Sequence, residues 1–180
     1  MNLKDAENIA HDLLLGGPEL ANHFRQWKIC GSIRRKRPYV NDIDIVAIPK
    51  PENSYKFGEL SLDAQIKDLD PEGRNYPKEN KRFLLGPKIK RFFYKQIMID
   101  IYIANEETFS TLCLIRTGSE RHNIALTQIA RGKGMKLFAD GTGLCNVDAG
   151  DKIINIVSAD EGEILQNLLG RVPTPEERER

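Results

Sequence analysis

Two short apolar segments of this chain contain aspartate, an acid that a buried β-strand normally excludes. Asp42 and Asp44 bracket the start of the apolar segment 43–48, and Asp100 interrupts the segment 96–103. Since side chains alternate between the two faces of a strand, Asp42 and Asp44 are predicted to project together from one face, while the isoleucines beside them hold the other face against a core. The chain must therefore fold so that acids from two strands lie beside a hydrophobic core.

The size of the chain limits its organisation. With 180 residues, 40% of them hydrophobic, it can form one compact core or two closely docked lobes, but not several independent domains. The apolar segments fall far short of the ~20 residues that a membrane span needs, and no charged-then-apolar leader precedes them. We therefore expect a soluble, cytoplasmic or otherwise intracellular protein that does not engage a membrane. Three cysteines without metal-ligand spacing are predicted to be buried free thiols: Cys30, Cys113 and Cys145.

The formal net charge of +1 averages over segments that differ in sign. Seven basic residues and one acid lie between Lys78 and Lys95, interleaved with aromatic residues. A charge run of this kind is most often a solvated face, but the interleaved rings favour a basic sheet surface. We predict that Lys88, Lys90 and Arg91 on this surface contact the phosphates of a nucleic acid.

The periodic segments predict an α+β fold, in which helices flank a mixed sheet and a smaller lobe follows. Helices are expected at residues 3–14, 18–25, 60–69 and 105–115, from 120 to about 133, and at 159–169. Strands are expected at 27–30, 43–48, 83–85, 89–94 and 96–103, with a tight turn at 31–32 and a hairpin over 135–147. The tail from Pro173 is expected to be frayed. A boundary near Glu107 divides the chain into residues 1–106 and 107–180.

The three aspartates would repel one another if they converge, and each would raise its neighbours' pKa values unless cations neutralised them. Carboxylates that leave room for water and phosphate suit Mg²⁺, and two such ions can activate an attacking hydroxyl group and stabilise a departing pyrophosphate. Just before the acidic strand, Gly31, Ser32 and Arg35 offer a close backbone approach, a hydroxyl donor and a guanidinium fork for phosphate. A D-x-D pair alone is weak evidence, because exposed acids are common in strands and turns. The ordered set is more specific.

Four motifs in order resemble those of family X DNA polymerases: Gly31-Ser32-Ile33-Arg34-Arg35, Asp42-Ile43-Asp44, Ile99-Asp100-Ile101-Tyr102 and Thr117-Gly118-Ser119. The resemblance spans roughly residues 27–136, and residues 159–179 resemble the closing helix and Pro-containing terminus of that family. It implies a nucleotidyltransferase palm in which Asp42, Asp44 and Asp100 bind two Mg²⁺ ions, for which Mn²⁺ can substitute. It also implies that Asp100 activates the primer 3′-hydroxyl, and that Ser32 and Arg35 contact the triphosphate.

The resemblance assigns further roles to the nucleotide-binding lobe after residue 106. Thr117-Gly118-Ser119 matches the turn that flanks the incoming sugar, where the family has a cis peptide between the last two residues. Asn123 matches the side chain that touches the incoming base in the minor groove, although a helix-surface amide is the alternative. Asn41, expected to contact phosphate through its backbone, departs from the family pattern because glycine usually stands there.

Three other departures bear on specificity. Arg116 stands where the family commonly has an aromatic residue, and a flexible cation there predicts a looser sugar gate. Thr127 stands where several relatives carry an arginine that probes the template base pair, which predicts low fidelity. Met98 replaces a basic residue that is often found two positions before the third aspartate.

The segment ahead of residue 27 is too short for the lyase domain and helix-hairpin-helix modules of the family, so we expect both to be absent, as in its smallest viral members. The implied partners are a DNA primer-template or gapped DNA and deoxynucleoside triphosphates, used by a monomer in short-gap repair synthesis. Two alternatives stay open: nucleotidyl transfer without a template or to RNA ends, small molecules or proteins, and a catalytically silent DNA-end-binding module. Retention of all three carboxylates speaks against the silent module, because clustered acids weaken DNA binding unless metals are recruited.

Overall fold

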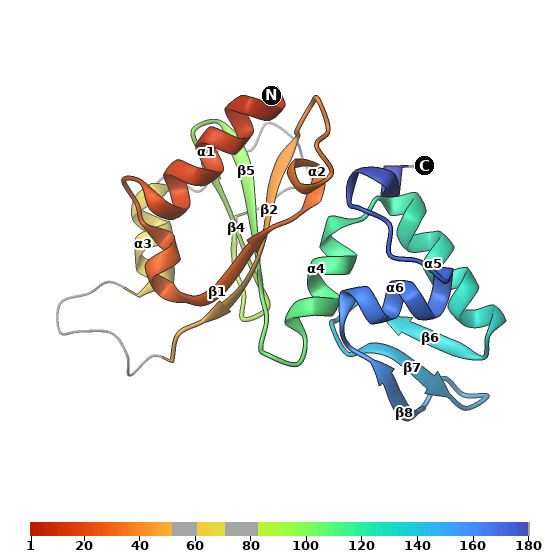
Figure 1. Ribbon diagram of the computed structural model, residues 1–180. Coiled ribbons are helices and arrows are strands. Elements are labelled where there is room, and N and C mark those ends of the chain that lie inside the picture. Colours follow the sequence, from red (N-terminus) through yellow and green to blue (C-terminus); the bar gives the residue numbers. More distant parts are fainter. Residues whose placement is uncertain (52–60, 71–82, 180) are drawn as a thin grey trace.

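The computed structural model describes residues 1–51, 61–70 and 83–179, and it is α+β as predicted. Figure 1 shows a five-stranded sheet with helices in the first part of the chain, a three-stranded sheet with helices in the last part, and α4 between them. The helices are α1 (Leu3–Leu15), the 3₁₀ turn η1 (Leu20–His23), α2 (Gly31–Arg34), α3 (Leu62–Leu69), α4 (Phe109–Thr117), α5 (Glu120–Gly132), α6 (Glu161–Leu169) and the 3₁₀ turn η3 (Glu176–Glu179). The strands are β1 (Phe24–Ile29), β2 (Asp42–Pro49), β3 (Leu84–Leu85), β4 (Ile89–Tyr94), β5 (Ile97–Ile103), β6 (Met135–Phe138), β7 (Gly143–Val147) and β8 (Ile153–Ser158).

The larger sheet is mixed, with the strand order β1-β2-β5-β4-β3. Its central pair, β2 and β5, runs parallel, and its other neighbours pair antiparallel. Parallel strands need a long crossover, and here the connection from β2 to β5 includes α3 and the strands β3 and β4. The two acid-bearing strands predicted from the sequence are therefore direct neighbours at the centre of the sheet.

One face of this sheet is covered by α1 and α3. The apolar residues of α1 recur at helical spacing, so Ala6, Ala10 and Leu13 are all buried on one side of that helix. They pack in one core with the buried side chains Ile43 of β2 and Ile99 of β5. Because side chains alternate along a strand, the aspartates next to these isoleucines belong to the opposite face.

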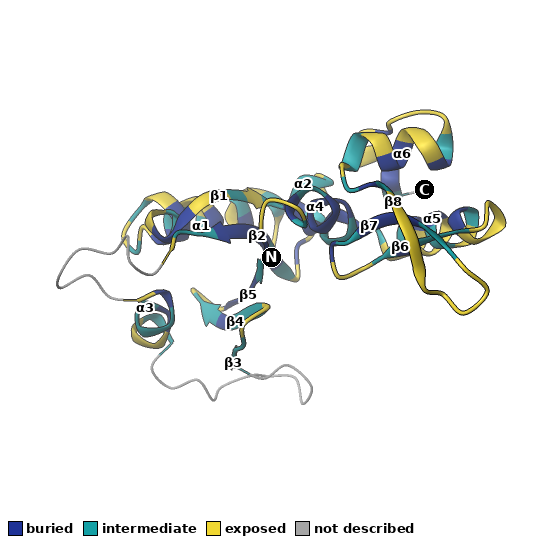
Figure 2. Cartoon of the chain, turned by 90° about the horizontal axis from the view of Figure 1, so that it is seen from below, coloured by how far each residue is buried: buried dark blue, intermediate teal, exposed yellow. Residues whose placement is uncertain are grey.

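Near the C-terminal end of β2, the opposite face of this strand packs against α4. Val46 and Ile48 form a buried cluster with Phe109 and Leu112 of α4. Leu114, on the same helix, belongs instead to the core of the last part of the chain. Helix α4 therefore contributes to both cores, and it forms the packed junction between the two sheets in Figures 1 and 2.

The last part of the chain has its own core, between α5, α6 and the sheet β6-β7-β8. Leu126 of α5, Leu144 of β7 and Ile164 of α6 are fully buried in it. Strand β8 is the edge of this sheet, and much of it is exposed, as its yellow colour in Figure 2 shows.

Near the N-terminus, two sequence predictions were wrong. Residues 18–25 do not form one helix, because a single 3₁₀ turn is followed by β1, which begins at Phe24 rather than at Trp27. Pairing with β2 explains the longer strand, since Phe24 lies opposite Pro49. The predicted tight turn at Gly31 is instead the start of the short helix α2.

Near the C-terminus, two further predictions were wrong. The segment after the predicted hairpin contains β8, which pairs with β7 and was not expected. The tail from Pro173 is not frayed, because η3 docks on the protein and Arg178 is only 3% exposed. The tail is ordered by partners distant in sequence, whereas β8 pairs with the strand just before it.

Other expectations about the chain have mixed outcomes. The three cysteines are buried and free, as predicted. No helix within the described residues is long and apolar enough to span a membrane. The division at residues 106 and 107 stays a prediction. Of the basic run, residues 78–82 lie outside the described part of the chain.

Candidate active site

The three aspartates lie on neighbouring strands of the larger sheet. In the parallel register of β2 and β5, Asp44 stands beside Asp100, and Asp42 stands beside Met98. Asp42 and Asp44 share one face of β2 by alternation, and neighbours in register share a face, so all three acids belong to the same face. Asp100 is buried, while Asp42 and Asp44 are partly exposed. The register thus places the three predicted carboxylates on one face of the sheet.

Burial and mutual repulsion perturb Asp44. Its pKa is raised to about 7, first by its burial and then by the charges of Asp42 and Asp100. Arg116 and Arg35 act in the opposite direction. A cation bound beside Asp44 would favour the charged form of this carboxyl group and so lower its pKa.

Gly31 allows α2 to begin directly against Asp44. Its φ is +57°, and a Cβ atom added there would lie 2.0 Å from Oδ2 of Asp44, so no other residue fits without displacing the carboxylate. The next residue, Ser32, has a buried Oγ without a hydrogen-bond partner. A buried hydroxyl without a partner is uncommon, and here it stands next to the acidic strand. Asn41, the residue before that strand, is exposed.

Asp100 is held by a cation from the neighbouring strand β4. Arg91 donates from Nε to Oδ1 at 2.5 Å and from Nη2 to Oδ2 at 2.6 Å. Tyr102 donates its hydroxyl to Oδ2 at 3.3 Å. With the side chains in these positions, no three Asp, Glu, His or Cys residues in the described ranges are grouped closely enough to hold a metal ion.

Arg35 lies at the contact between α2 and the last part of the chain. It donates to the backbone oxygen of Thr117 through Nη1 and to Glu179 of η3 through Nε. The peptide bond from Gly118 to Ser119 is cis, as the family resemblance implies. Ser119 caps α5 and donates its hydroxyl to the backbone oxygen of Arg178 at 2.7 Å. The turn at residues 117–119 thus lies between Arg35 and the C-terminal tail.

A cavity of about 700 Å³ opens between the acidic sheet face and α5. It is lined by Arg35, Asp44, Tyr102, Ile115, Arg116, Gly118, Glu120, Asn123, Ile124, Thr127, Gln128, Arg131, Leu137 and Ala139. The Oδ1 atom of Asn123 is buried in it without a partner, while Nδ2 donates to Ile115 O at 2.8 Å. The guanidinium of Arg116 lies 4.0 Å from the centre of the Tyr102 ring. This cavity combines carboxylate, guanidinium and unpaired amide groups from both parts of the chain.

A comparison with known protein families identifies the last part of the chain. Residues 112–179 match the family model described as DNA polymerase beta thumb. The match covers less than half of the chain, and it supports a likeness of this segment to the thumb of family X DNA polymerases. The matched segment, called the thumb below, includes the turn at 117–119 and Asn123, whereas the sheet with the aspartates precedes it. A comparison with curated proteins finds no match.

The predicted DNA-contact residues do not form one surface. Since side chains alternate along β4, Lys90 and Arg91 lie on opposite faces of the sheet. Lys90 pairs with Asp63 of α3 at 2.7 Å, and its side chain is largely buried. Arg91 is engaged by Asp100. The expectation that Lys88, Lys90 and Arg91 share a basic stripe is therefore corrected: strand alternation separates two of these cations and acids engage both.

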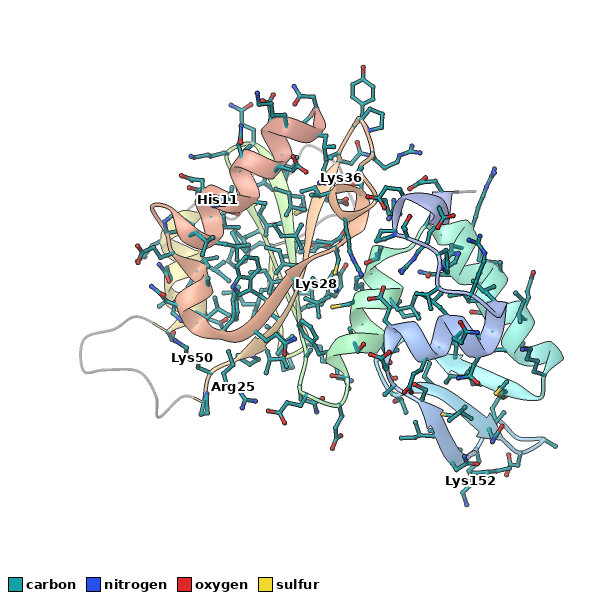
Figure 3. The ribbon with its side chains drawn as sticks, in the orientation of Figure 1. His11, Arg25, Lys28, Lys36, Lys50 and Lys152 are labelled. Carbon is teal, nitrogen blue, oxygen red and sulfur yellow. The ribbon has the colours of Figure 1, made fainter. Side chains whose placement is uncertain are left out.

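A buried ion-pair network between the sheet and the thumb was missed. Glu161 of α6 accepts from Arg34 at 2.9 Å through both of its oxygens and from Arg178 at 2.7 Å. Lys28, labelled in Figure 3, lies 3.9 Å from the same carboxylate. These residues are far apart in sequence, and an acid in the first turn of a helix is ordinarily a helix-dipole feature. No sequence signal marked Glu161 as the centre of a network.

Proposed function

We propose that this protein is a metal-dependent DNA polymerase of the family X type, which adds deoxynucleotides to a primer 3′-hydroxyl group. The observation that carries the proposal is the parallel register of Asp44 and Asp100 on the face that opens toward the thumb cavity. In this proposal the palm comprises residues 1–106, and it includes the sheet with the aspartates. The thumb match supports the same assignment, because it was found independently of the acidic motifs.

The donor set fits divalent metal. Asp42, Asp44 and Asp100 are hard oxygen donors, and the pKa of Asp44 is raised first by burial and then by the negative charges of Asp42 and Asp100. These three residues would hold two Mg²⁺ or Mn²⁺ ions. Such ions supply charge neutralisation for the attacking oxygen and for the departing pyrophosphate.

The chain's own residues bind and orient the substrates in this proposal. Ser32 and Arg35 hold the triphosphate, since the free hydroxyl of Ser32 and the guanidinium of Arg35 are donors beside the acidic face. As the oxygen of the primer 3′-hydroxyl group attacks, a carboxylate oxygen of Asp100 accepts the proton of that hydroxyl group. Asn123 offers its unpaired Oδ1 to the incoming nucleotide. The turn at 117–119 borders the sugar.

DNA and deoxynucleoside triphosphates are the proposed partners. The described cavity is open toward α5, where Gln128 and Arg131 add donors about one and two helical turns beyond Asn123. Lys88 remains a proposed phosphate contact. Thr127 donates its hydroxyl to Asn123 O at 2.9 Å, so it is turned back on its own helix and is a poor probe of a template base. We propose low fidelity on this ground.

Primer extension tests the proposal directly. A labelled primer is incubated alone, on a template, and at a one-nucleotide gap, with each nucleotide class in the presence of Mg²⁺. Extension that follows the template sequence supports a DNA-directed polymerase. Untemplated addition supports the terminal or RNA-modifying alternative. DNA binding without extension under every condition supports the silent binding module.

Asp100→Asn is the decisive variant for the chemistry. We expect extension to fall by about four orders of magnitude, because alignment and charge stabilisation are lost together, while DNA binding is retained. Asp151→Asn is the matched control, since Asp151 is a surface acid that pairs with Lys136. Single-turnover extension and a gel-shift assay measure the two properties. Near-normal turnover of Asp100→Asn in Mg²⁺ would contradict the assignment.

A further inference from the structure

Arg91 engages Asp100 more completely than a surface ion pair would. It stands directly opposite Asp100 in the antiparallel register of β4 and β5, and its fork contacts both carboxylate oxygens. The side chain of Asp100 is 5% exposed and that of Arg91 is 25% exposed. Bidentate, charge-assisted pairs of this geometry are the strong ones, and burial of the carboxylate strengthens the pair further.

We propose that Arg91 is an internal counterion for the carboxylate cluster, which a divalent metal ion must displace from Asp100. This inference rests on the proposed function, because it concerns the same three aspartates. The guanidinium occupies the two oxygens that a metal ion would need, so arginine and metal compete for one carboxylate.

In the metal-free protein, the pair of Arg91 and Asp100 reduces the net negative charge on the acidic sheet face. The negative charges of three carboxylates on one sheet face repel one another. Arg91 places a positive charge directly against one of them, Asp100. Met98, which lies beside Asp42 in the parallel register, brings no charge to the site. The cation therefore comes from β4 and not from the acidic strands.

Release of Arg91 is compatible with its surroundings. Its partial exposure gives the guanidinium access to solvent, whereas Asp100 is buried and fixed by its strand. In the metal-free structure the charge of Asp42 also acts on Arg91 and raises its pKa, after the larger effects of Asp100. Metal occupancy would thus change the position of one cation at the mouth of the site.

Binding of Mn²⁺ to the 180-residue chain, measured by electron paramagnetic resonance without DNA or nucleotide, tests the proposal. Arg91→Gln should bind the first Mn²⁺ at least about fivefold more tightly than the wild type, because the competitor is gone. Arg91→Lys should lie between them, since lysine cannot make the bidentate contact. Lys90→Gln is the matched control, because it removes the same charge from the neighbouring position on the other sheet face, and its affinity should stay within about twofold of the wild type.

A second measurement uses the wild type, so that the test does not depend on how a variant folds. The Nε–Hε NMR signal of Arg91, assigned by its absence in Arg91→Lys, should move when Mg²⁺ is added. Unchanged or weaker Mn²⁺ binding by Arg91→Gln, or an Arg91 signal that ignores Mg²⁺, would overturn the inference. Asp42→Asn separates the two proposals: if Mn²⁺ binding survives it unchanged, the proposed metal site itself fails, whereas its loss together with a neutral Arg91→Gln removes only the counterion role.

Discussion

At the scale of single residues, Asp44 is destabilising in the metal-free protein. Its pKa is about 7 in the folded chain against an ordinary value of 3.8, so the folded state binds more protons between these values. The contribution of Asp44 to the free energy of unfolding therefore falls as pH rises from about 4 to 7, by at most about 4 kcal/mol. We expect Asp44→Asn to raise the midpoint of thermal unfolding at pH 8 in chelator-treated buffer.

The pH series provides the control for this prediction. At pH 4.5 the wild-type carboxyl group is already neutral in the folded state, so the advantage of Asp44→Asn should shrink there. Added Mg²⁺ should also reduce the advantage at pH 8, because it stabilises only the charged form. An advantage of equal size at both pH values would show that the substitution acts through packing and not through charge.

The side chain of Arg116 is more restrained in the structure than the sequence predicted. A long cation before the 117–119 turn was expected to swing freely and loosen the sugar gate. The structure instead stacks Arg116 on the ring of Tyr102, with a buried Nε atom that has no partner. A guanidinium on an aromatic face is a planar, restrained group, so the argument from flexibility does not hold.

At the scale of elements, the C-terminal tail is tied to α2 and α6 by one carboxylate. Glu161 is the shared partner of Arg34 and Arg178, and its side chain is 12% exposed. Removing the charge leaves two arginines largely buried without compensation. We expect Glu161→Gln to reduce the free energy of unfolding by about 3 kcal/mol, measured by urea denaturation.

Glu177→Gln is the matched control for the tail. Glu177 lies in the 3₁₀ turn η3 together with Arg178, but it pairs with Arg171 at 3.2 Å on the surface. Surface ion pairs contribute little, so the loss should stay below about 1 kcal/mol. Equal losses for both variants would mean that the tail is held by general charge and not by the buried network.

At the scale of the whole molecule, α4 couples the two sheets. Phe109 and Leu112 pack with β2 of the larger sheet, and Leu114 packs in the thumb core. One rigid helix shared by two cores should make them unfold together. We expect a single calorimetric transition in the wild type, and in Phe109→Ala a loss of about 3–4 kcal/mol with separation into two transitions.

Ile154→Ala is the control for this coupling. Ile154 is 67% exposed on the edge strand β8, so its truncation leaves no cavity and should change neither the stability nor the number of transitions. Two resolved transitions in the wild type would contradict the coupling through α4.

Much of the fold was predictable because it depends on local patterns. The spacing of apolar residues placed α1, and β4 was predicted with its observed bounds. The faces of β2 followed from simple alternation, which located the acids of the candidate site. By contrast, β8 was not predicted, although it pairs with β7 across the short connection at residues 148–152. The burial of Arg178 required knowledge of Glu161, which is near it in space and not in the sequence pattern.

The sequence by itself determined which carboxylates share a sheet face, because alternation along a strand is a local property of the backbone. At Gly31 the sequence predicted a close backbone approach to phosphate, and it was the structure that placed Asp44 so near that no side chain fits. Only the tertiary structure decided the partners of the charged residues. Arg91 turns to Asp100, Arg34 to Glu161, and Lys90 to Asp63. The physical reason is that the strength of an ion pair depends on the distance between the charges and on their burial. Both are set only when the strands and helices have packed, so the sequence pattern does not reveal them.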